Sequence, residues 1–150
     1  MKGIFLGICI MVFALCACSK KLSVQEQYEV DKDIIEEYLT ENGLTAEVTP
    51  SGLYYVITSL GSGNFPIETS DVMVRYVGKF TDNQVFDQSD EMGITFNLQQ
   101  VIPGWTEGIS LFKEGGEGIL ILPSKLAYGP NGDSSIPPNS VLVFDVELLN

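Results

Sequence analysis

A set of aromatic side chains, with two polar residues among them, is the part of this sequence whose types and spacing could do chemistry. The set consists of Tyr76, Phe86, Asp87, Trp105, Tyr128 and Phe144. For most lone aromatic residues, burial in an ordinary core is the simpler explanation. Asp87 and Tyr128, however, lie beside loops, where binding residues are often found. We therefore take this set as the candidate functional site.

Other kinds of chemistry find little support in the sequence. The chain has no histidine, which excludes Ser-His-Asp and Cys-His catalysis and histidine-ligated metals. No residues have the spacing of a metal site or a calcium loop, so no metal or cofactor is expected. The glycine-rich segments at 61–63 and 115–118 lack the Lys-Ser/Thr of a phosphate loop and are interpreted as turns. A carboxylate pair for glycoside hydrolysis stays open, although nothing singles out two acids.

The net charge of the chain limits the kinds of partner that it is expected to bind. The 150 residues contain 20 Asp and Glu against 8 Lys and Arg, a net charge of −12. Such an acidic chain repels phosphate backbones, so nucleic acid is not an expected partner. The length corresponds to about one domain with a sizeable core.

The N-terminus has the features of a targeting segment. Lys2 precedes an apolar run over 4–17, which at about 14 residues matches a signal-peptide core and is short for a membrane span. The run ends in Leu15-Cys16-Ala17-Cys18, which resembles a bacterial lipobox with Cys18 as the lipidated residue; Cys16 is a poorer candidate. Ser19 after it favours an outer-membrane anchor facing the periplasm, by resemblance to lipoprotein sorting. The alternatives are an ordinary secretory signal with incidental cysteines and, less favoured, a transmembrane anchor.

A helix is predicted over 24–42. Ser23 and Glu26 form a capping-box pattern at its start, and Asn42-Gly43 is a stop signal. One face carries apolar residues and the other is acidic. The acidic residues are Glu26, Glu29, Asp31, Asp33, Glu36, Glu37 and Glu41. We favour a solvated spacer between membrane and domain over a dimerisation or partner helix.

The chain beyond residue 52 has the texture of strands. Alternating or apolar segments over 53–60, 72–80, 94–98, 119–122 and 141–148 predict strands. One helix fits among them, beginning near Pro103 and ending at Gly115-Gly116. The spacing predicts an α+β domain, an antiparallel sheet with one short helix on one face.

The order of these segments resembles that of the FKBP-type peptidyl-prolyl cis-trans isomerases over 52–150. The matching pieces are Val74-x-Tyr76-x-Gly78, Val85-Phe86-Asp87-x-Ser89, Phe96-x-Leu98, Val101-Ile102-Pro103-Gly104-Trp105-x-Glu107-Gly108, Lys113-Glu114-Gly115-Gly116, Pro123-Ser124-x-Leu126-Ala127-Tyr128-Gly129, Ile136-Pro137-Pro138-Asn139 and Phe144-Asp145-Val146-Glu147-Leu148. The lipobox and the acidic helix further resemble lipoprotein members from bacterial envelopes. The resemblance implies a strongly twisted antiparallel sheet wrapped around the short helix.

The resemblance also implies a role for each matching position. Trp105 forms the floor of an apolar pocket, and Tyr128 and the backbone N–H of Ile102 donate hydrogen bonds to the substrate. The walls are Tyr76, Phe86, Val101, Ile102 and Phe144; Asp87 lies at the rim, Ala127 and Ile136 line the flanking loop, and Ile94 stands at a further substrate-binding position. Family members often pair the aspartate with an arginine, whereas this sequence has Met92 near that place, so Asp87 is expected to be held less firmly.

The resulting expectation is an enzyme that accelerates rotation about X-Pro bonds in folding envelope proteins. No bond is broken, so no nucleophile or metal is required. The alternative is an FKBP-like chaperone or binding module with little catalysis. We expect a signal peptide over 1–17, a lipidated tether and acidic helix over 18–47, and the isomerase domain over 48–150, as a monomer or weak dimer. The resemblance also makes macrolides candidate ligands of the pocket.

Overall fold

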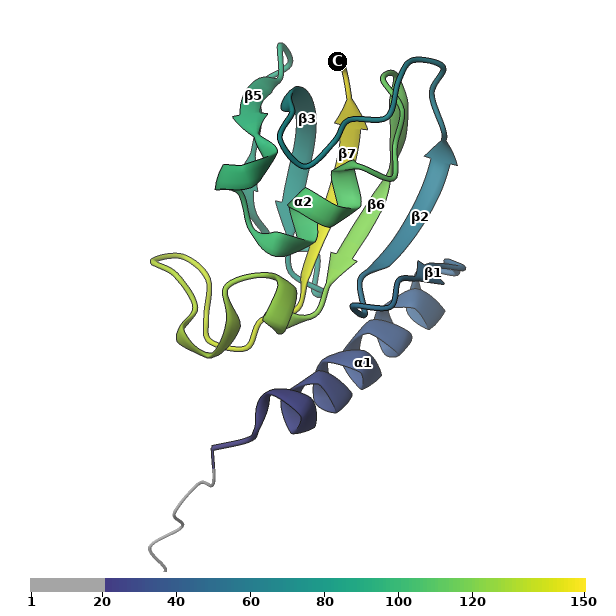
Figure 1. The fold of residues 1–150 in the computed structure, drawn as a ribbon. Coiled ribbons are helices and arrows are strands. Elements are labelled where there is room, and N and C mark those ends of the chain that lie inside the picture. Colours follow the sequence, from purple (N-terminus) through teal and green to yellow (C-terminus); the bar gives the residue numbers. More distant parts are fainter. Residues whose placement is uncertain (1–20) are drawn as a thin grey trace, which may run out of the picture.

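One seven-stranded antiparallel sheet organises residues 21–150, the part of the chain that this computed structural model describes (Figure 1). The strands are β1 (Glu47–Val48), β2 (Tyr54–Ser59), β3 (Asp71–Lys79), β4 (Val85–Gln88), β5 (Ile94–Asn97), β6 (Gly116–Leu122) and β7 (Leu142–Leu148). Their spatial order is β1-β2-β6-β7-β3-β4, and β5 pairs with β3. The helices are α1 (Val24–Glu41), α2 (Pro103–Ile109) and the short 3₁₀ turns η1 (Leu98–Gln100), η2 (Ser124–Leu126) and η3 (Gly129–Asn131).

The inner face of the sheet wraps around α2 (Figure 1). Alternate residues of β3 and β7 point into this core, as the period of two predicts. The core includes Val72, Val74, Trp105, Ile109, Phe112, Leu142, Phe144, Val146 and Leu148. The predicted α+β architecture, with a twisted antiparallel sheet around one short helix and a preceding N-terminal helix, is confirmed.

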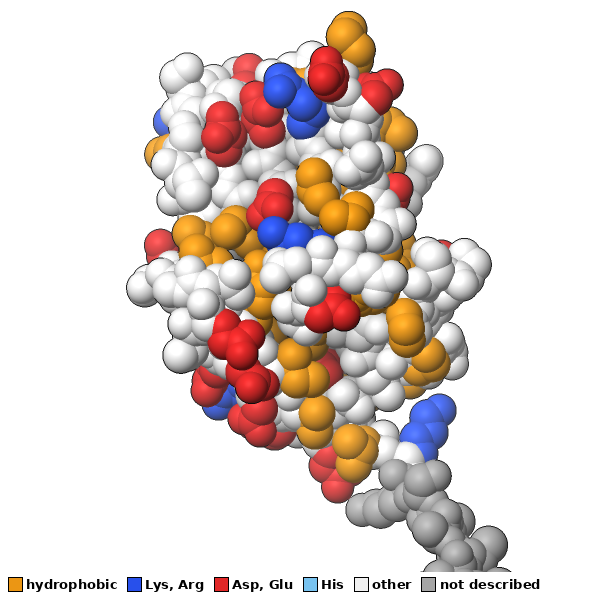
Figure 2. All heavy atoms as spheres, turned by 180° about the vertical axis from the view of Figure 1, so that it is seen from behind, with side chains coloured by type: hydrophobic (Ala, Val, Ile, Leu, Met, Phe, Trp, Pro, Cys, Tyr) orange, Lys and Arg blue, Asp and Glu red, His pale blue; other side chains and the backbone are white. Residues whose placement is uncertain are grey.

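The outer face of the sheet is covered in part by α1. Ile35 and Tyr38 of the helix pack against Ile121 of β6 and Val143 of β7. The side chains of Ile35 and Tyr38 are buried. The interpretation of this helix as a solvated spacer is therefore wrong for its middle turns. Figure 2 shows the acidic side chains of the helix gathered on its remaining, outward face.

Asp31 is a second correction on α1. The sequence pattern predicts a solvated acid at this position, but Asp31 is 0% exposed. The capping box predicted at the start of the helix is present, with Ser23 and Glu26 bonded reciprocally.

Helix α2 is shorter than predicted. It begins with Pro103 in its first turn, as expected, but ends at Ile109 rather than near Gly115-Gly116. The backbone then continues in turns, one of which is closed by a hydrogen bond from the Phe112 N–H to the Ile109 carbonyl. Strand β1 was not predicted, because two residues carry no periodic signal.

The expectations for the N-terminal segment, including lipidation of Cys18, fall on residues 1–20 and lie outside the described residues. Over residues 21–150, no helix is both long and apolar enough to cross a bilayer.

Candidate functional site

A cavity of about 450 Å³ opens between α2, β3, β7 and the loops beside them. Its lining is mostly aromatic and aliphatic. The lining residues are Tyr76, Phe86, Asp87, Phe96, Gln100, Val101, Ile102, Trp105, Tyr128 and Phe144. Apolar walls with a few polar groups at defined places are typical of small-ligand sites.

Trp105 anchors the cavity from the first turns of α2. Three rings meet the indole edge to face: Tyr76 at 5.0 Å, and Phe96 and Phe144 each at 5.4 Å between centroids, with interplanar angles of 82–87°. This arrangement satisfies the ring quadrupoles and leaves the indole only 4% exposed. Its Nε1 is buried and has no hydrogen-bond partner among residues 21–150.

Tyr76 and Asp87 form a polar pair at one edge of the cavity. The Tyr76 hydroxyl donates to Asp87 Oδ2 at 2.6 Å, and the Gln88 N–H donates to Asp87 Oδ1 at 2.9 Å. Burial, and then the hydrogen bond to Asp87, raise the pKa of Tyr76 well above its usual range. Tyr76 therefore stays protonated at neutral pH, and it restrains the Asp87 carboxylate although Met92 stands where family members often have an arginine.

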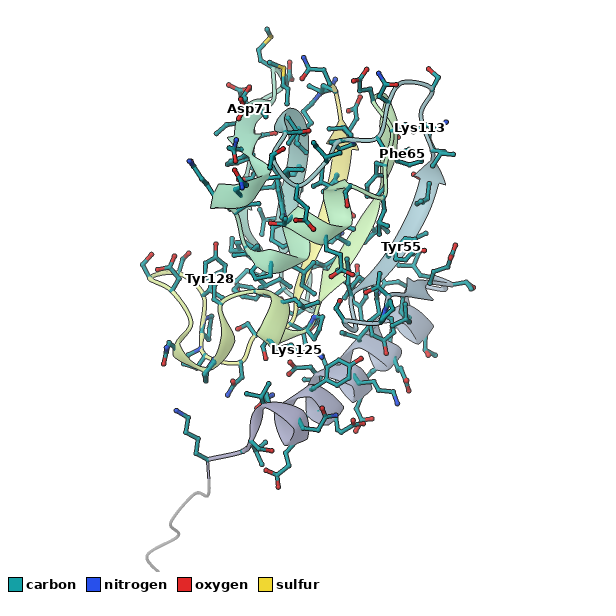
Figure 3. All side chains as sticks on the ribbon, viewed as in Figure 1. Tyr55, Phe65, Asp71, Lys113, Lys125 and Tyr128 are labelled. Carbon is teal, nitrogen blue, oxygen red and sulfur yellow. The ribbon has the colours of Figure 1, made fainter. Side chains whose placement is uncertain are left out.

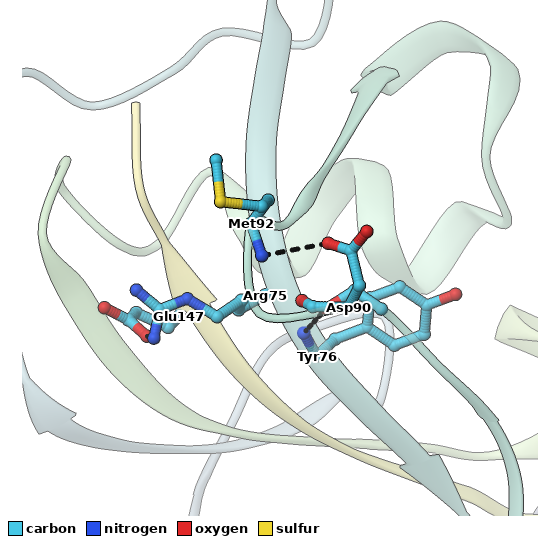
Figure 4. A network of polar contacts seen from close by, with 6 residues as sticks. Arg75, Tyr76, Asp90, Met92 and Glu147 are labelled. Carbon is cyan, nitrogen blue, oxygen red and sulfur yellow. Dashed lines mark hydrogen bonds and ion pairs between the residues drawn. The ribbon is translucent and has the colours of Figure 1, made fainter.

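Figure 4 shows what holds the loop between β4 and β5 against β3. The Tyr76 N–H of β3 donates to Ser89 Oγ at 3.1 Å, which ties the loop to the strand. Within the loop, the Met92 N–H donates to Asp90 Oδ1 at 2.9 Å. The Met92 side chain is 79% exposed and points away from Tyr76. The expectation of a loosely held Asp87 is thus corrected, because Tyr76 restrains it and Met92 takes no part.

Tyr128 also lines the cavity and lies on the loop that follows β6 (Figure 3). The residue is 37% exposed. Burial, then the charges of Asp133 and Asp87, raise the pKa of its hydroxyl. The hydroxyl is therefore a protonated donor at neutral pH, at the rim of the aromatic cavity.

Ile102 offers a second donor. It is the residue before α2, with extended backbone angles, and Pro103 follows it in the first helical turn. Its carbonyl accepts from the N–H groups of Trp105 and Thr106. No hydrogen bond from its own N–H occurs within residues 21–150, so this N–H is available to a ligand.

The structure brings most of the sequence-predicted residues together and leaves three outside the lining. Tyr76, Phe86, Asp87, Val101, Ile102, Trp105, Tyr128 and Phe144 line one cavity. Ile136 is 4% exposed and belongs to the core, and Ala127 packs against that core. Ile94 on β5 is 44% exposed.

Phe96 and Gln100 line the cavity although neither was singled out as a site residue. Phe96 occurs in one of the motifs, and its spacing of two residues from Leu98, a core residue that begins η1, is the signal that could have identified it. Gln100 lies in the 3₁₀ turn η1, whose direction no sequence pattern gives.

A second hollow, of about 570 Å³, lies on the outer face of the sheet, the side seen in Figure 2. Ion pairs border it, with Arg75 3.1 Å from Glu147 and Lys79 2.7 Å from Asp145. Its walls carry no aromatic cluster, so it differs in kind from the inner cavity. No group of three or more His, Cys, Asp or Glu side chains that could hold a metal occurs in residues 21–150.

The inner cavity and the sheet that forms it agree with comparisons to known proteins. The family described as FKBP-type peptidyl-prolyl cis-trans isomerase matches residues 63–149. The crystal structure of FkpA from Escherichia coli superposes with a TM-score of 0.71 at 36% identity, covering 87% of this chain and 73% of that one. A peptidyl-prolyl cis-trans isomerase from Pseudomonas syringae gives a TM-score of 0.74 at 29% identity, covering 87% and 97%. The chain belongs to the FKBP-type peptidyl-prolyl cis-trans isomerase family.

Relatives named FKBP-type peptidyl-prolyl cis-trans isomerase FkpA show the same similarity in sequence. The one from Aeromonas hydrophila is 47% identical over 139 residues, and the one from Escherichia coli K12 is 41% identical over 140 residues. The matches cover 86% and 87% of this chain but 52% and 51% of those relatives. The chain thus spans about half the length of these curated relatives.

Proposed function

We propose that this protein is an active peptidyl-prolyl cis-trans isomerase that accelerates rotation about X-Pro bonds in unfolded proteins. The observation that carries the proposal is the aromatic cavity, with Trp105 enclosed by three rings and donors at its rim. This cavity is large enough for a proline ring and its flanking amide. Rotation about the amide bond breaks no covalent bond, so the reaction needs no nucleophile in the cavity.

The energetics of amide rotation fit such a site. Resonance gives the peptide bond a rotational barrier of about 18–20 kcal/mol. The planar amide is more polar than the twisted one, because twisting ends the resonance that places charge on oxygen. A pocket poor in water therefore disfavours the planar state relative to the twisted one. Fixed donors that fit the twisted geometry lower the barrier further by differential binding.

Each residue has a role in this proposal. Trp105 supports the proline ring from below, and the Ile102 N–H and the Tyr128 hydroxyl donate to substrate carbonyls. The walls are Tyr76, Phe86, Phe96, Val101, Ile102 and Phe144. Asp87, restrained by Tyr76 at 2.6 Å, keeps the Tyr76 ring at a fixed angle to the indole. Ala127 and Ile136 act from the flanking loop, and Ile94 extends the surface beyond the pocket.

The test is the cis-to-trans rate of a short X-Pro peptide with catalytic amounts of the full chain, purified in a mild detergent. We expect acceleration that an FKBP-class macrolide blocks by competing for the same cavity. Tyr128→Phe should lower kcat/KM about tenfold, the effect of one hydrogen bond of about 1.4 kcal/mol. A well-folded chain that leaves the rate unchanged would leave the binding-module alternative in its place.

We further propose that the protein is a lipoprotein of a bacterial envelope, anchored through Cys18 to the outer membrane and facing the periplasm. Residues 1–17 would be the signal peptide, 18–47 the tether and helix, and 48–150 the isomerase domain. The short apolar run and the lipobox-like Cys18 support this. Two or more acyl chains would anchor it firmly. Its substrates would be proline-containing envelope proteins before they fold.

The anchor can be tested by metabolic labelling with a fatty-acid analogue followed by membrane fractionation. Cys18→Ala should abolish both the label and the membrane association. Cys16→Ala, a matched control two residues away, should leave both unchanged. Label that persists in Cys18→Ala would contradict the proposal. Sedimentation of the labelled protein in detergent would distinguish a monomer from a weak dimer.

A further inference from the structure

Asp31 is a carboxylate in a fully buried position, where acidic residues are rarely found. It is 0% exposed, on a helix whose other acids face solvent. Its Oδ2 accepts from the Ser124 N–H at 2.7 Å and from Ser124 Oγ at 2.6 Å, and its Oδ1 accepts from Gln27 Nε2 at 2.7 Å. No Lys or Arg forms an ion pair with it within residues 21–150. Burying a charge is costly unless hydrogen bonds compensate it, so these three bonds define the orientation of the side chain closely.

Ser124 begins the loop that carries Tyr128. It is 2% exposed and comes directly after Pro123, where β6 has ended. Its N–H starts the turn η2 and has no earlier carbonyl to bond, so Asp31 satisfies it. The Ser124 carbonyl in turn accepts from the Ala127 N–H at 3.0 Å. The position of Ser124 is thus transmitted through one turn to the residue before Tyr128.

The rest of this loop, residues 124–139, is tied to itself rather than to α1. The Asn139 N–H donates to the Gly129 carbonyl at 2.9 Å, and Asp133 and Ile136 bond each other in both directions. A cavity of about 760 Å³ separates Pro130 and Gly129 from the first turn of α1. The contacts between this loop and the helix described here lie at the start of the loop, at Ser124 and Lys125.

Lys125 adds a second contact at the same end. Its Nζ lies 3.6 Å from the centroid of the Tyr28 ring of α1, a favourable cation–π distance. Figure 3 shows Lys125 at the end of the loop next to α1 and Tyr128 farther from the helix. Of the two contacts, only the one made by Asp31 is buried.

We propose that Asp31 is a positioning residue for the isomerase pocket: by holding Ser124, it sets where Tyr128 stands at the rim. The proposal rests on the proposed function for its effect on catalysis, and on the structure alone for its effect on the loop. Tyr128 forms the substrate contact and Asp31 forms none, since it lies outside the lining of the cavity. Tyr128 is the residue of the 124–139 loop that lines the cavity, so loss of the Asp31 contact should act chiefly through Tyr128.

The test combines hydrogen exchange with a double-mutant cycle on the full chain in detergent. Asp31→Asn should speed amide exchange in residues 126–139 and lower kcat/KM about fivefold, mostly through kcat, as expected for a weakened charge-assisted hydrogen bond. In a Tyr128→Phe background the same substitution should lower kcat/KM much less than in the wild type, because coupled residues are not additive. Asp33→Asn, an exposed acid two residues away, is the matched control and should change neither readout.

Two results would overturn the inference. Unchanged exchange in residues 126–139 would refute the positioning of the loop, whatever the catalytic activity. An equal loss of kcat/KM in the presence and absence of the Tyr128 hydroxyl would show that Asp31 acts on general stability instead. If Asp31→Asn does not fold, Ser124→Ala, which removes only the 2.6 Å hydroxyl bond, replaces it in the same cycle. A wild-type chain without isomerase activity would refute the proposed function, while the exchange experiment would still decide the positioning of the loop.

Discussion

The two faces of the sheet differ in what they bury and in what they do. The inner face carries the aromatic cavity around Trp105, which stays open to solvent at its rim. The outer face is covered in part by α1, through Ile35 and Tyr38, and its uncovered part carries the hollow beside Arg75 and Glu147. Strands β6 and β7 serve both faces, because their successive residues alternate between the two clusters. One face is arranged for binding and the other for stability.

This division is crossed where α1 contacts the start of the 124–139 loop. Asp31 belongs to the helix of the outer face, yet its partner Ser124 begins the loop of the inner cavity, 93 residues farther along the chain. The comparison therefore predicts that substitutions on the outer face change stability without changing catalysis, except at this contact. The following predictions test that division, from the largest expected effect to the smallest.

Ile35→Ala should lower the free energy of unfolding by about 2–5 kcal/mol, as for other fully buried aliphatic residues. Its side chain is 0% exposed between α1 and the sheet. Urea titration followed by circular dichroism would measure the change, and kcat/KM of the folded fraction should stay at the wild-type value. Val30→Ala, on the exposed side of the same helix, is the control. A large loss of kcat/KM in folded Ile35→Ala would break the division between the faces.

Trp105→Leu should lower kcat/KM by about 30-fold, equivalent to about 2 kcal/mol from the loss of its ring contacts. The peptide isomerisation assay measures this directly. Phe112→Leu is the matched control, because Phe112 is a buried aromatic of the same core that does not line the cavity. It should lose stability and keep its activity. Equal losses of activity in both variants would contradict the assignment of the pocket.

Gly78→Ala should reduce kcat/KM by about five- to tenfold, or about 1–1.4 kcal/mol. A Cβ on Gly78 would lie 2.8 Å from Phe86 Cζ and 3.0 Å from Phe144 Cε1, so both walls of the cavity must shift. Phe86→Leu provides the control, because it removes the closer of the two atoms. In the Phe86→Leu background, Gly78→Ala should lower kcat/KM only slightly further. A full additional loss of kcat/KM would show that Gly78 acts through the backbone instead.

The pH dependence should show the smallest effect. The pKa of Tyr76 is raised by burial and by its hydrogen bond to Asp87, and that of Tyr128 by burial and nearby carboxylates. Both hydroxyls stay protonated in the folded state, so kcat/KM should be flat from about pH 6 to 9. Since the unfolded chain releases these protons near pH 10 and the folded chain retains them, the free energy of unfolding should fall only above about pH 10. A fall in activity centred below pH 9 would contradict this.

The sequence was informative about the inner face because its pattern is local. Alternation in β3 and β7 oriented Val72, Val74 and Phe144 correctly, and the aromatic residues near turns marked the cavity. Gln100 was missed because the chain bends from β5 into η1 before it. That direction depends on packing against α2, which no local pattern records.

The outer face was harder to predict, although one signal was available. The runs at 119–122 and 141–144 are continuously apolar, which indicates strands covered on both faces. Taken together with the apolar stripe of α1, they could have indicated that the helix packs on the sheet. Nothing local distinguishes Asp31 from the solvated acids around it, because its burial depends on Ser124 in a distant loop.

Trp105 also makes the protein its own optical probe. It is the single tryptophan of the chain, and its indole is held among rings with Nε1 buried and unbonded within the described residues. All indole fluorescence therefore originates at the floor of the cavity, in an apolar setting that gives emission at short wavelength. A peptide or macrolide that enters the cavity replaces water above this fluorophore, so occupancy can be followed without any label. Because α1 carries no tryptophan, this emission follows the inner face of the sheet and not the helix on the outer face.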